Sequence, residues 1–235
     1  MAYSIAYQFN IMWLDGVIWL PIIILGIDRI INKNKSELFF ISLSIAIISN
    51  WYIGFMLCVF SFMYVLYSLI LANDITLIKR TFKKFFMFGI LAAFTGLIVI
   101  APAIYTCLHE VPRLVASADG TVNYTLIDIL SKFVIGSFDF YQITDSNFAD
   151  NYLNLPNLFA GTGVLFLFIL YFFNKSVDKK DKMKDGIFGA ILLAITLITP
   201  LNRVWHVFTY NVWFPYRYSF CLVFYMIYIA YKSFL

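Results

Sequence analysis

Long apolar runs without charge alternate with short charged linkers along the whole chain. Such runs predict membrane-spanning helices, because about 20 apolar residues cross a hydrocarbon core of about 30 Å. We predict seven spans, roughly at residues 12–28, 37–49, 52–72, 85–107, 157–173, 186–201 and 217–233. They are separated by charged linkers at 28–37, 73–84 and 174–185. The pattern predicts an all-α polytopic membrane protein, with residues 1–235 in one transmembrane domain.

The stretch from Leu38 to Ala72 carries no charge. As a single helix it would measure about 52 Å, which is too long for the hydrocarbon core. Basic linkers at both of its ends also require an even number of crossings. We therefore predict a helical hairpin that turns near "SNWYIG" (49–54), where Ser, Asn and Gly favour a turn.

Composition supports a membrane protein and argues against other classes that a basic chain suggests. Charged residues make up 13% of the chain and hydrophobic residues 62%, whereas soluble domains have about 25% charged residues. The net charge of +4 comes from the linkers, so we expect no nucleic-acid partner. Cys58, Cys107 and Cys221 lie in or beside apolar runs without a CxxC or a His pair, so we predict no metal site and no cofactor.

The distribution of Lys and Arg predicts the orientation of the chain. Of the 17 basic residues, 13 lie in the three linkers or at the end of the last span. The other connections hold Arg113, Lys132, Arg203 and Arg217. Because cytoplasmic loops are enriched in Lys and Arg, we expect the linkers in the cytoplasm and the other connections outside.

The longest outer connection is the predicted extracytoplasmic loop 108–156. Within it, "YTLIDILSKFV" (124–134) predicts an amphipathic helix with Asp128 and Lys132 on its polar face. Its apolar face carries Leu126, Ile127, Leu130, Phe133 and Val134. Such a helix either lies on the outer leaflet or packs against the protein, and the sequence leaves both open.

The first ten residues, "MAYSIAYQFN", lack the basic segment of a signal peptide. The predicted topology places Met1 outside and has an odd number of spans. We therefore expect this sequence to be a piece of a longer membrane protein. The alternative is a chain that starts outside without a signal.

Three polar residues are predicted at a similar depth in the membrane. Helix rise places Asp15, Asn50 and Arg217 each about 21–22 Å from a basic residue on the cytoplasmic side. They would floor an outward-open cavity, with Arg203 and His206 near its rim. A guanidinium binds phosphate through two hydrogen bonds and keeps its charge when partly desolvated. The arginines therefore suggest a site for the phosphate of a lipid-linked substrate, although an ordinary anionic headgroup has the same chemistry.

Each of these residues also has a purely structural interpretation. Asp15 would then cap the first helix, and Asn50 would serve the tight turn. His206 would be an interfacial anchor beside Trp205, and Arg217 would reach lipid headgroups or pair with Asp15. The sequence leaves both interpretations open.

The chain resembles the YfhO family of bacterial membrane proteins in three aromatic-rich stretches, at residues 10–31, 49–67 and 202–220. They read "NIMWLDGVIWLPIIILGIDRII", "SNWYIGFMLCVFSFMYVLY" and "NRVWHVFTYNVWFPYRYSF", and "LPNLFAG" (155–161) fits the same pattern. The resemblance implies a GT-C type glycosyltransferase. It would move a sugar from undecaprenyl phosphate to a cell-envelope polymer such as lipoteichoic acid, on the outer face. Family members are longer, so the resemblance implies a middle section whose principal catalytic base lies in a preceding part.

The resemblance also implies the site residues. We expect substrate binding by residues at or beside the motif positions: Asn50, Tyr52, Arg203, His206, Tyr216 and Arg217. Within this set Arg217 is expected to bind the phosphate, and Asp15 is expected to be an auxiliary acidic group. The alternatives are a non-catalytic transporter or lipid-handling protein, and a remnant without activity.

Overall fold

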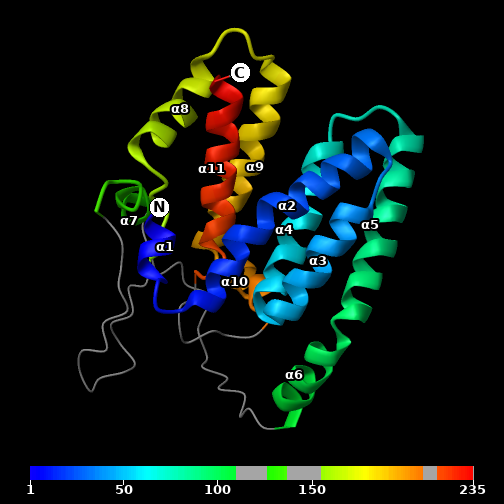
Figure 1. Cartoon of the computed structure of the whole chain (residues 1–235). Helices are drawn as coiled ribbons and strands as arrows, with labels where there is room; N and C mark the ends of the chain where they lie inside the picture. The colour runs from blue at the N-terminus through cyan, green and yellow to red at the C-terminus, as the bar shows by residue number, and fades with distance from the viewer. Residues whose placement is uncertain (110–125, 137–154, 209–215, 235) are drawn as a thin grey trace, which may run out of the picture. The chain divides into compact units, whose positions relative to one another are not determined.

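The computed structural model describes residues 1–109, 126–136, 155–208 and 216–234, and every regular element in these ranges is a helix (Figure 1). The chain forms two compact units. Unit 1 contains Met1–Ile11 and Ser117–Leu235, and unit 2 contains Met12–Ala116.

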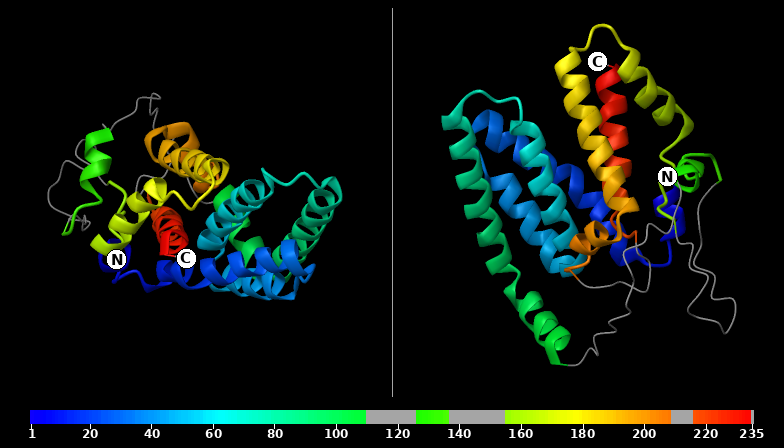
Figure 2. Two further views of the ribbon diagram at one scale, coloured as in Figure 1. Left: turned by 90° about the horizontal axis from the view of Figure 1, so that it is seen from above. Right: turned by 180° about the vertical axis from the view of Figure 1, so that it is seen from behind.

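Unit 2 is a bundle of antiparallel helices with a bent last pair. Its helices are α2 (Ile11–Lys33), α3 (Glu37–Ser49), α4 (Trp51–Leu69), α5 (Ile75–Thr95) and α6 (Leu97–His109). Helix α3 packs against both α4 and α5 (Figure 2). Helices α5 and α6 meet at Gly96 with a bend of 74°. The predicted span 85–107 is therefore two helices rather than one straight helix.

Small residues let the helices of unit 2 approach closely. A Cβ atom added to Gly26 of α2 would lie 2.7 Å from the Cα atom of Phe39 in α3. A Cβ atom added to Gly54 of α4 would lie 3.0 Å from the Cα atom of Ile47 in α3. Such glycines are typical of membrane helix interfaces, where association depends on close packing. The predicted hairpin within 38–72 is thus confirmed as α3 and α4, which turn at Asn50.

Unit 1 is built around its last helix. Its helices are α1 (Ala2–Ala6), α7 (Leu126–Ser131), α8 (Thr162–Phe173), α9 (Lys179–Leu197), α10 (Thr199–Trp205) and α11 (Ser219–Phe234). Helices α8 and α9 both pack against α11 (Figure 1). The short α1 also belongs here, because the buried ring of Tyr3 lies 5.5 Å from that of Phe220.

The structure has a helix at each predicted apolar run, but fewer helices satisfy the requirements of a full span. In the described ranges α2 and α4 are long and apolar enough to cross a membrane, and the bent pair α5–α6 would be a third. Helices α3, α8 and α11 are apolar but shorter. Seven crossings remain a prediction.

The linker predicted at 174–185 is partly helical, because α9 already begins at Lys179. The physical reason is that Lys, Asp and Met are compatible with a helix. Charged residues indicate where a helix leaves an apolar environment, but they do not end the helix. A helix ends where the chain has a capping residue or a helix breaker. The predicted span 186–201 likewise covers parts of α9 and α10, which meet at Ile198.

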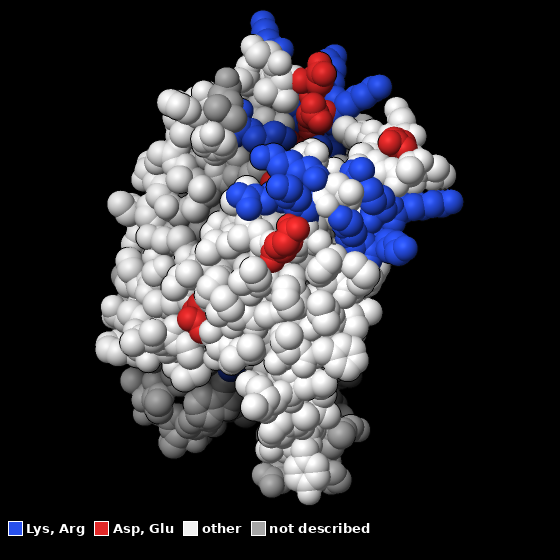
Figure 3. Space-filling model, turned by 45° about the vertical axis from the view of Figure 1, so that its right-hand side comes forward, with Lys and Arg blue, Asp and Glu red and all other residues white. Residues whose placement is uncertain are grey.

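The basic residues of unit 2 gather where its helices are connected. Arg80 of α5 donates a hydrogen bond of 3.0 Å to the carbonyl of Ile31, and Lys84 donates to the carbonyl of Asn34. On the face drawn in Figure 3, many Lys and Arg side chains lie close together, and much of the remaining surface carries little charge. This grouping agrees with basic linkers on one side, while the side of the membrane remains a prediction.

The helix predicted at 124–134 is only partly as expected, and most of the loop 108–156 lies outside the described residues. Ile127 and Val134 are 76% and 59% exposed, so an apolar face is indeed presented outward. Lys132, predicted on the polar face with Asp128, is instead buried. The reason is that α7 ends at Ser131, and Lys132 turns back to donate its N–H to the carbonyl of Ile129.

Candidate functional site

Four of the predicted site residues meet at one end of unit 1. Arg203 and His206 come from the end of α10, and Tyr216 and Arg217 come from the turn before α11. Trp205 and Tyr218 hold these two segments together, because their buried rings stack at 4.7 Å. We call these six residues the α10–α11 cluster.

Aromatic contacts fix the interior of the α10–α11 cluster. The ring of His206 meets the ring of Tyr218 edge-on at 5.9 Å, and His206 is only 2% exposed. The hydroxyl of Tyr216 donates to the carbonyl of Thr196 at 3.2 Å. His206 is therefore a packed residue of the cluster, and its position at the membrane interface stays a prediction.

Arg217 lies at the edge of this cluster and is half-buried. The predicted last span begins at Arg217, but α11 begins only at Ser219. The reason is a tight turn, in which the N–H of Ser219 donates to the carbonyl of Tyr216 at 2.9 Å. The backbone of Arg217 is fixed by the hydroxyl of Tyr3, which donates to its carbonyl at 2.9 Å.

The backbone after α10 is strained. Val207 and Phe208 have φ angles of 56° and 59°, in the left-handed region that β-branched and bulky residues avoid. The carbonyl of Arg203 holds this turn, because it accepts the N–H groups of His206 and Phe208 at 3.0 and 2.9 Å. Strain of this kind tends to persist at functional sites, where the surrounding structure supports it.

The remaining predicted site residues belong to unit 2. Asn50 caps α4, because its side-chain oxygen accepts the N–H groups of Tyr52 and Ile53 at 3.2 Å. Its amide nitrogen donates to the carbonyl of Met12 at 3.0 Å and so ties α4 to the start of α2. Asn50 therefore serves the turn between α3 and α4, as its structural interpretation predicted.

Asp15 does not cap its helix. Helix α2 begins at Ile11, so Asp15 lies in its second turn and is half-buried. The contact between Asn50 and Met12 brings Asn50 to the same part of unit 2. Asp15 and Asn50 thus belong to unit 2 and Arg217 to unit 1, and the common cavity floored by all three remains a prediction.

Unit 1 also contains a large apolar cavity that we did not expect. It has a volume of about 780 Å³ and is lined by residues of α7, α8, α9 and α11 and by Phe159. On α9 the lining includes Gly186, Gly189 and Ala190, and the lack of a side chain at Gly189 lets the Tyr225 ring approach, because a Cβ atom added there would lie 3.0 Å from that ring. This run of small residues within an apolar helix was the available signal in the sequence.

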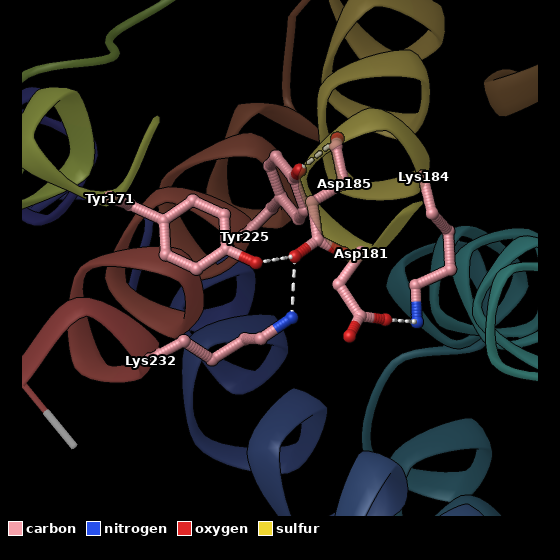
Figure 4. Close-up of polar contacts among 6 residues, drawn as sticks. All are labelled: Tyr171, Asp181, Lys184, Asp185, Tyr225 and Lys232. Carbon is pink, nitrogen blue, oxygen red and sulfur yellow. Dashed lines mark hydrogen bonds and ion pairs between the residues drawn. The ribbon is translucent and has the colours of Figure 1, made fainter. Parts of the chain in front are cut away.

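A buried polar cluster lies at one end of this cavity, and we call it the Asp185 cluster (Figure 4). Asp185 of α9 is fully buried, and its carboxylate accepts hydrogen bonds from the Tyr171 hydroxyl and the Lys232 ammonium. Its backbone carbonyl accepts the hydroxyl of Tyr225. The cluster joins α8, α9 and α11. We predicted Asp185 and Lys232 only as loop and terminal charges, and no local signal identified them as a pair.

Comparison with known proteins places these features in a family context. The whole chain, residues 1–235, matches the family model described as "Bacterial membrane protein YfhO". A protein of Bacillus subtilis (strain 168), named "Uncharacterized protein YfhO", is 27% identical over 103 residues. The match covers 41% of this chain and 11% of that protein, so the matched part is a small fraction of that relative. No solved structure matches the chain.

Proposed function

We propose, from the premise that this chain belongs to the YfhO family of bacterial membrane proteins, that it contributes to a membrane glycosyltransferase site. The donor would be a sugar on undecaprenyl phosphate, and the acceptor a cell-envelope polymer such as lipoteichoic acid. Transfer would take place at the outer face of the cell membrane, with the linkers 28–37, 73–84 and 174–185 in the cytoplasm and loop 108–156 outside.

The observation that supports this proposal most strongly is the α10–α11 cluster. It brings two arginines and an imidazole together with aromatic rings at one end of unit 1. Arg217 is the proposed phosphate ligand, because the residue is half-buried and its backbone carbonyl is held by the hydroxyl of Tyr3. When the sugar leaves the lipid phosphate, negative charge develops on that phosphate, and a fixed cation stabilises it. Arg203 would extend the binding surface, while His206 and Tyr216, which are only 2% and 4% exposed, would support it from within the α10–α11 cluster.

Unit 2 carries the other residues with a proposed role. Asp15 is proposed as an auxiliary acidic group, because its half-buried position in α2 leaves it partly accessible. Tyr52 follows the cap of α4 and is also half-buried, so it is proposed to contact substrate. Asn50 would act mainly by fixing this part of the helix pair.

A non-catalytic lipid-handling protein is the second candidate. The apolar cavity of about 780 Å³ favours it, because a lipid chain fits there without any chemistry. The two functions differ in what Arg217 does: a transferase needs its charge during the reaction, whereas a lipid carrier needs it only for binding.

The test is to replace Arg217 by Ala and by Lys at the native locus and to measure sugar transfer to the envelope polymer in isolated membranes. We expect Arg217→Ala to lower the rate about 100-fold or more, as for the loss of one electrostatic stabiliser. Arg217→Lys should retain part of the rate, because it keeps the charge without the guanidinium fork. Lys175→Ala, an exposed basic residue before α9, is the control and should transfer at the normal rate. Normal transfer by both Arg217 variants would refute the assignment.

A further inference from the structure

We infer that the cavity of unit 1 binds the isoprenoid chain of the polyprenyl phosphate whose phosphate Arg217 holds. This inference rests on the proposed function and adds the position of the lipid chain. The wall of the cavity is apolar. Apart from Asp185 at one end, the lining is made almost entirely of apolar and aromatic side chains. A cavity of about 780 Å³ with such a lining leaves many atoms without packing partners unless an apolar molecule fills it.

The shape of the cavity suits a chain rather than a compact ligand. Its lining on α8 runs from Thr162 to Phe172, which corresponds to about 15 Å along the helix axis. Leu130 and Val134 of the α7 segment also line it and are more than half exposed. An apolar chain could therefore enter beside α7 and lie along α8.

The aromatic rings in the wall favour an isoprenoid chain over a saturated acyl chain. Phe133, Phe159, Phe168, Phe172 and Tyr225 all line the cavity. A methyl-branched, unsaturated chain is wider and stiffer than an acyl chain. It therefore loses less conformational freedom when it is ordered in a wide cavity.

Two adjacent residues of α1 connect this cavity to Arg217. The N–H of Ala2 donates to the carbonyl of Phe159, a lining residue, at 2.8 Å. The hydroxyl of the next residue, Tyr3, donates to the carbonyl of Arg217 at 2.9 Å. Leu222, another lining residue, lies in the first turn of α11, shortly after Arg217. The cavity thus begins at the end of unit 1 that holds the proposed phosphate ligand.

The other end of the cavity is closed by the Asp185 cluster. Tyr171 of α8 reaches across to the carboxylate of Asp185 on α9, and Lys232 pairs with the same carboxylate. An apolar chain gains nothing by displacing this polar group. The chain would therefore enter at the Arg217 end, and its tail would stop before Asp185.

The experiment uses the 235-residue chain in phosphatidylcholine vesicles and a polyprenyl phosphate with a photoreactive group on its chain. Labelled positions are mapped by proteolysis and mass spectrometry. We expect label on α8 and α9 at residues that line the cavity. Unlabelled polyprenyl phosphate should compete, whereas phosphatidylglycerol and inorganic phosphate should not. Equal competition by phosphatidylglycerol would mean an ordinary lipid site and would overturn the inference.

Matched variants fill the cavity or leave it open. Ala190→Trp places a large side chain in the cavity and should lower labelling about tenfold, because the chain loses apolar area that it would bury. Ile191 is the next residue of α9 but does not line the cavity, so Ile191→Trp should label as the wild type does. Leu165→Trp fills the cavity from α8 and replaces Ala190→Trp if that variant does not fold. Unchanged labelling of a folded cavity-filling variant would refute the site.

Failure of this inference can be separated from failure of the proposed function. If labelling is unspecific but sugar transfer still depends on Arg217, the cavity proposal alone fails. If labelling is specific but Arg217→Ala transfers sugar normally, the transferase proposal alone fails.

Discussion

Replacement of Lys232 by Met should destabilise unit 1 strongly. The carboxylate of Asp185 is completely buried and has two side-chain partners, the Tyr171 hydroxyl and the Lys232 ammonium. Met keeps most of the apolar stem of Lys but removes the charge. The buried carboxylate then loses its counter-ion, which typically costs 3–5 kcal/mol. Because the Lys232 side chain is 25% exposed, we expect the lower end, about 3 kcal/mol.

The assay is thermal unfolding of the purified chain in detergent, followed by tryptophan fluorescence. For a protein of this size, about 3 kcal/mol corresponds to a decrease in Tm of about 6–12 °C. Lys184→Met is the matched control, because Lys184 forms a salt bridge of 3.7 Å with Asp181, whose side chain is 44% exposed (Figure 4). The Lys184 side chain is 17% exposed, but the Asp181 carboxylate is partly open to water and is not left as a buried ion, so this control should lower Tm by less than about 4 °C.

A double variant tests the cause of the effect. Asp185→Leu together with Lys232→Met removes both charges and leaves no buried ion without a partner. It should therefore unfold at a higher temperature than Lys232→Met alone. The reasoning would be refuted if Lys232→Met and Lys184→Met gave the same Tm, or if the double variant were less stable than either single variant.

Two further predictions concern unit 2. Asn50→Ala should lower the free energy of unfolding by about 1–2 kcal/mol in thermal unfolding, because α4 loses its cap and α2 loses the contact at Met12. Asn50→Asp should keep the cap, so equal destabilisation by the Ala and Asp variants would contradict the capping role. The backbone N–H groups of Leu77 and Thr76 lower the pKa of Asp74 at the start of α5, so its ionised form stabilises the folded helix. This contribution is present above the unfolded pKa and is lost as pH falls through the lower folded pKa. Hydrogen exchange in the first turn of α5 should therefore be faster in Asp74→Ala than in wild type at pH 7, with the difference vanishing in acid; a difference that persisted in acid would contradict it.

The parts of the fold that depend on local pattern could be predicted from the sequence. The hairpin of α3 and α4 followed from a charge-free stretch too long for one helix, and its turn at Asn50 followed from the residue types there. Helix ends were harder to predict. The start of α11 at Ser219 depends on a turn that no residue pattern announced, and α9 begins inside a charged linker.

Contacts between distant residues could not be predicted. Lys232 and Asp185 are 47 residues apart, and Tyr3 and Arg217 are 214 apart. Lys232 could be the counter-ion of a buried carboxylate or a terminal basic residue that orients the chain in the membrane. Both roles need only a Lys near the end of an apolar helix, so the local sequence does not distinguish them. Burial separates them, because a buried carboxylate on a neighbouring helix requires a counter-ion, whereas the positive-inside rule requires none.

The same ion pair gives the cavity of unit 1 its physical basis. Helices α8 and α9 both pack on α11, and Tyr171 joins α8 to Asp185 of α9 at one end, while α8 runs away from α9 toward α7 (Figure 1). One end of α8 is tied to α9 through Tyr171 and Asp185, and the segment before its other end is held by α1 through the hydrogen bond from Ala2 to Phe159. Loss of Lys232 should then loosen the wall of the cavity as well as lower stability. Photolabelling by polyprenyl phosphate should therefore spread from the cavity to neighbouring apolar surfaces in Lys232→Met and remain confined in Lys184→Met.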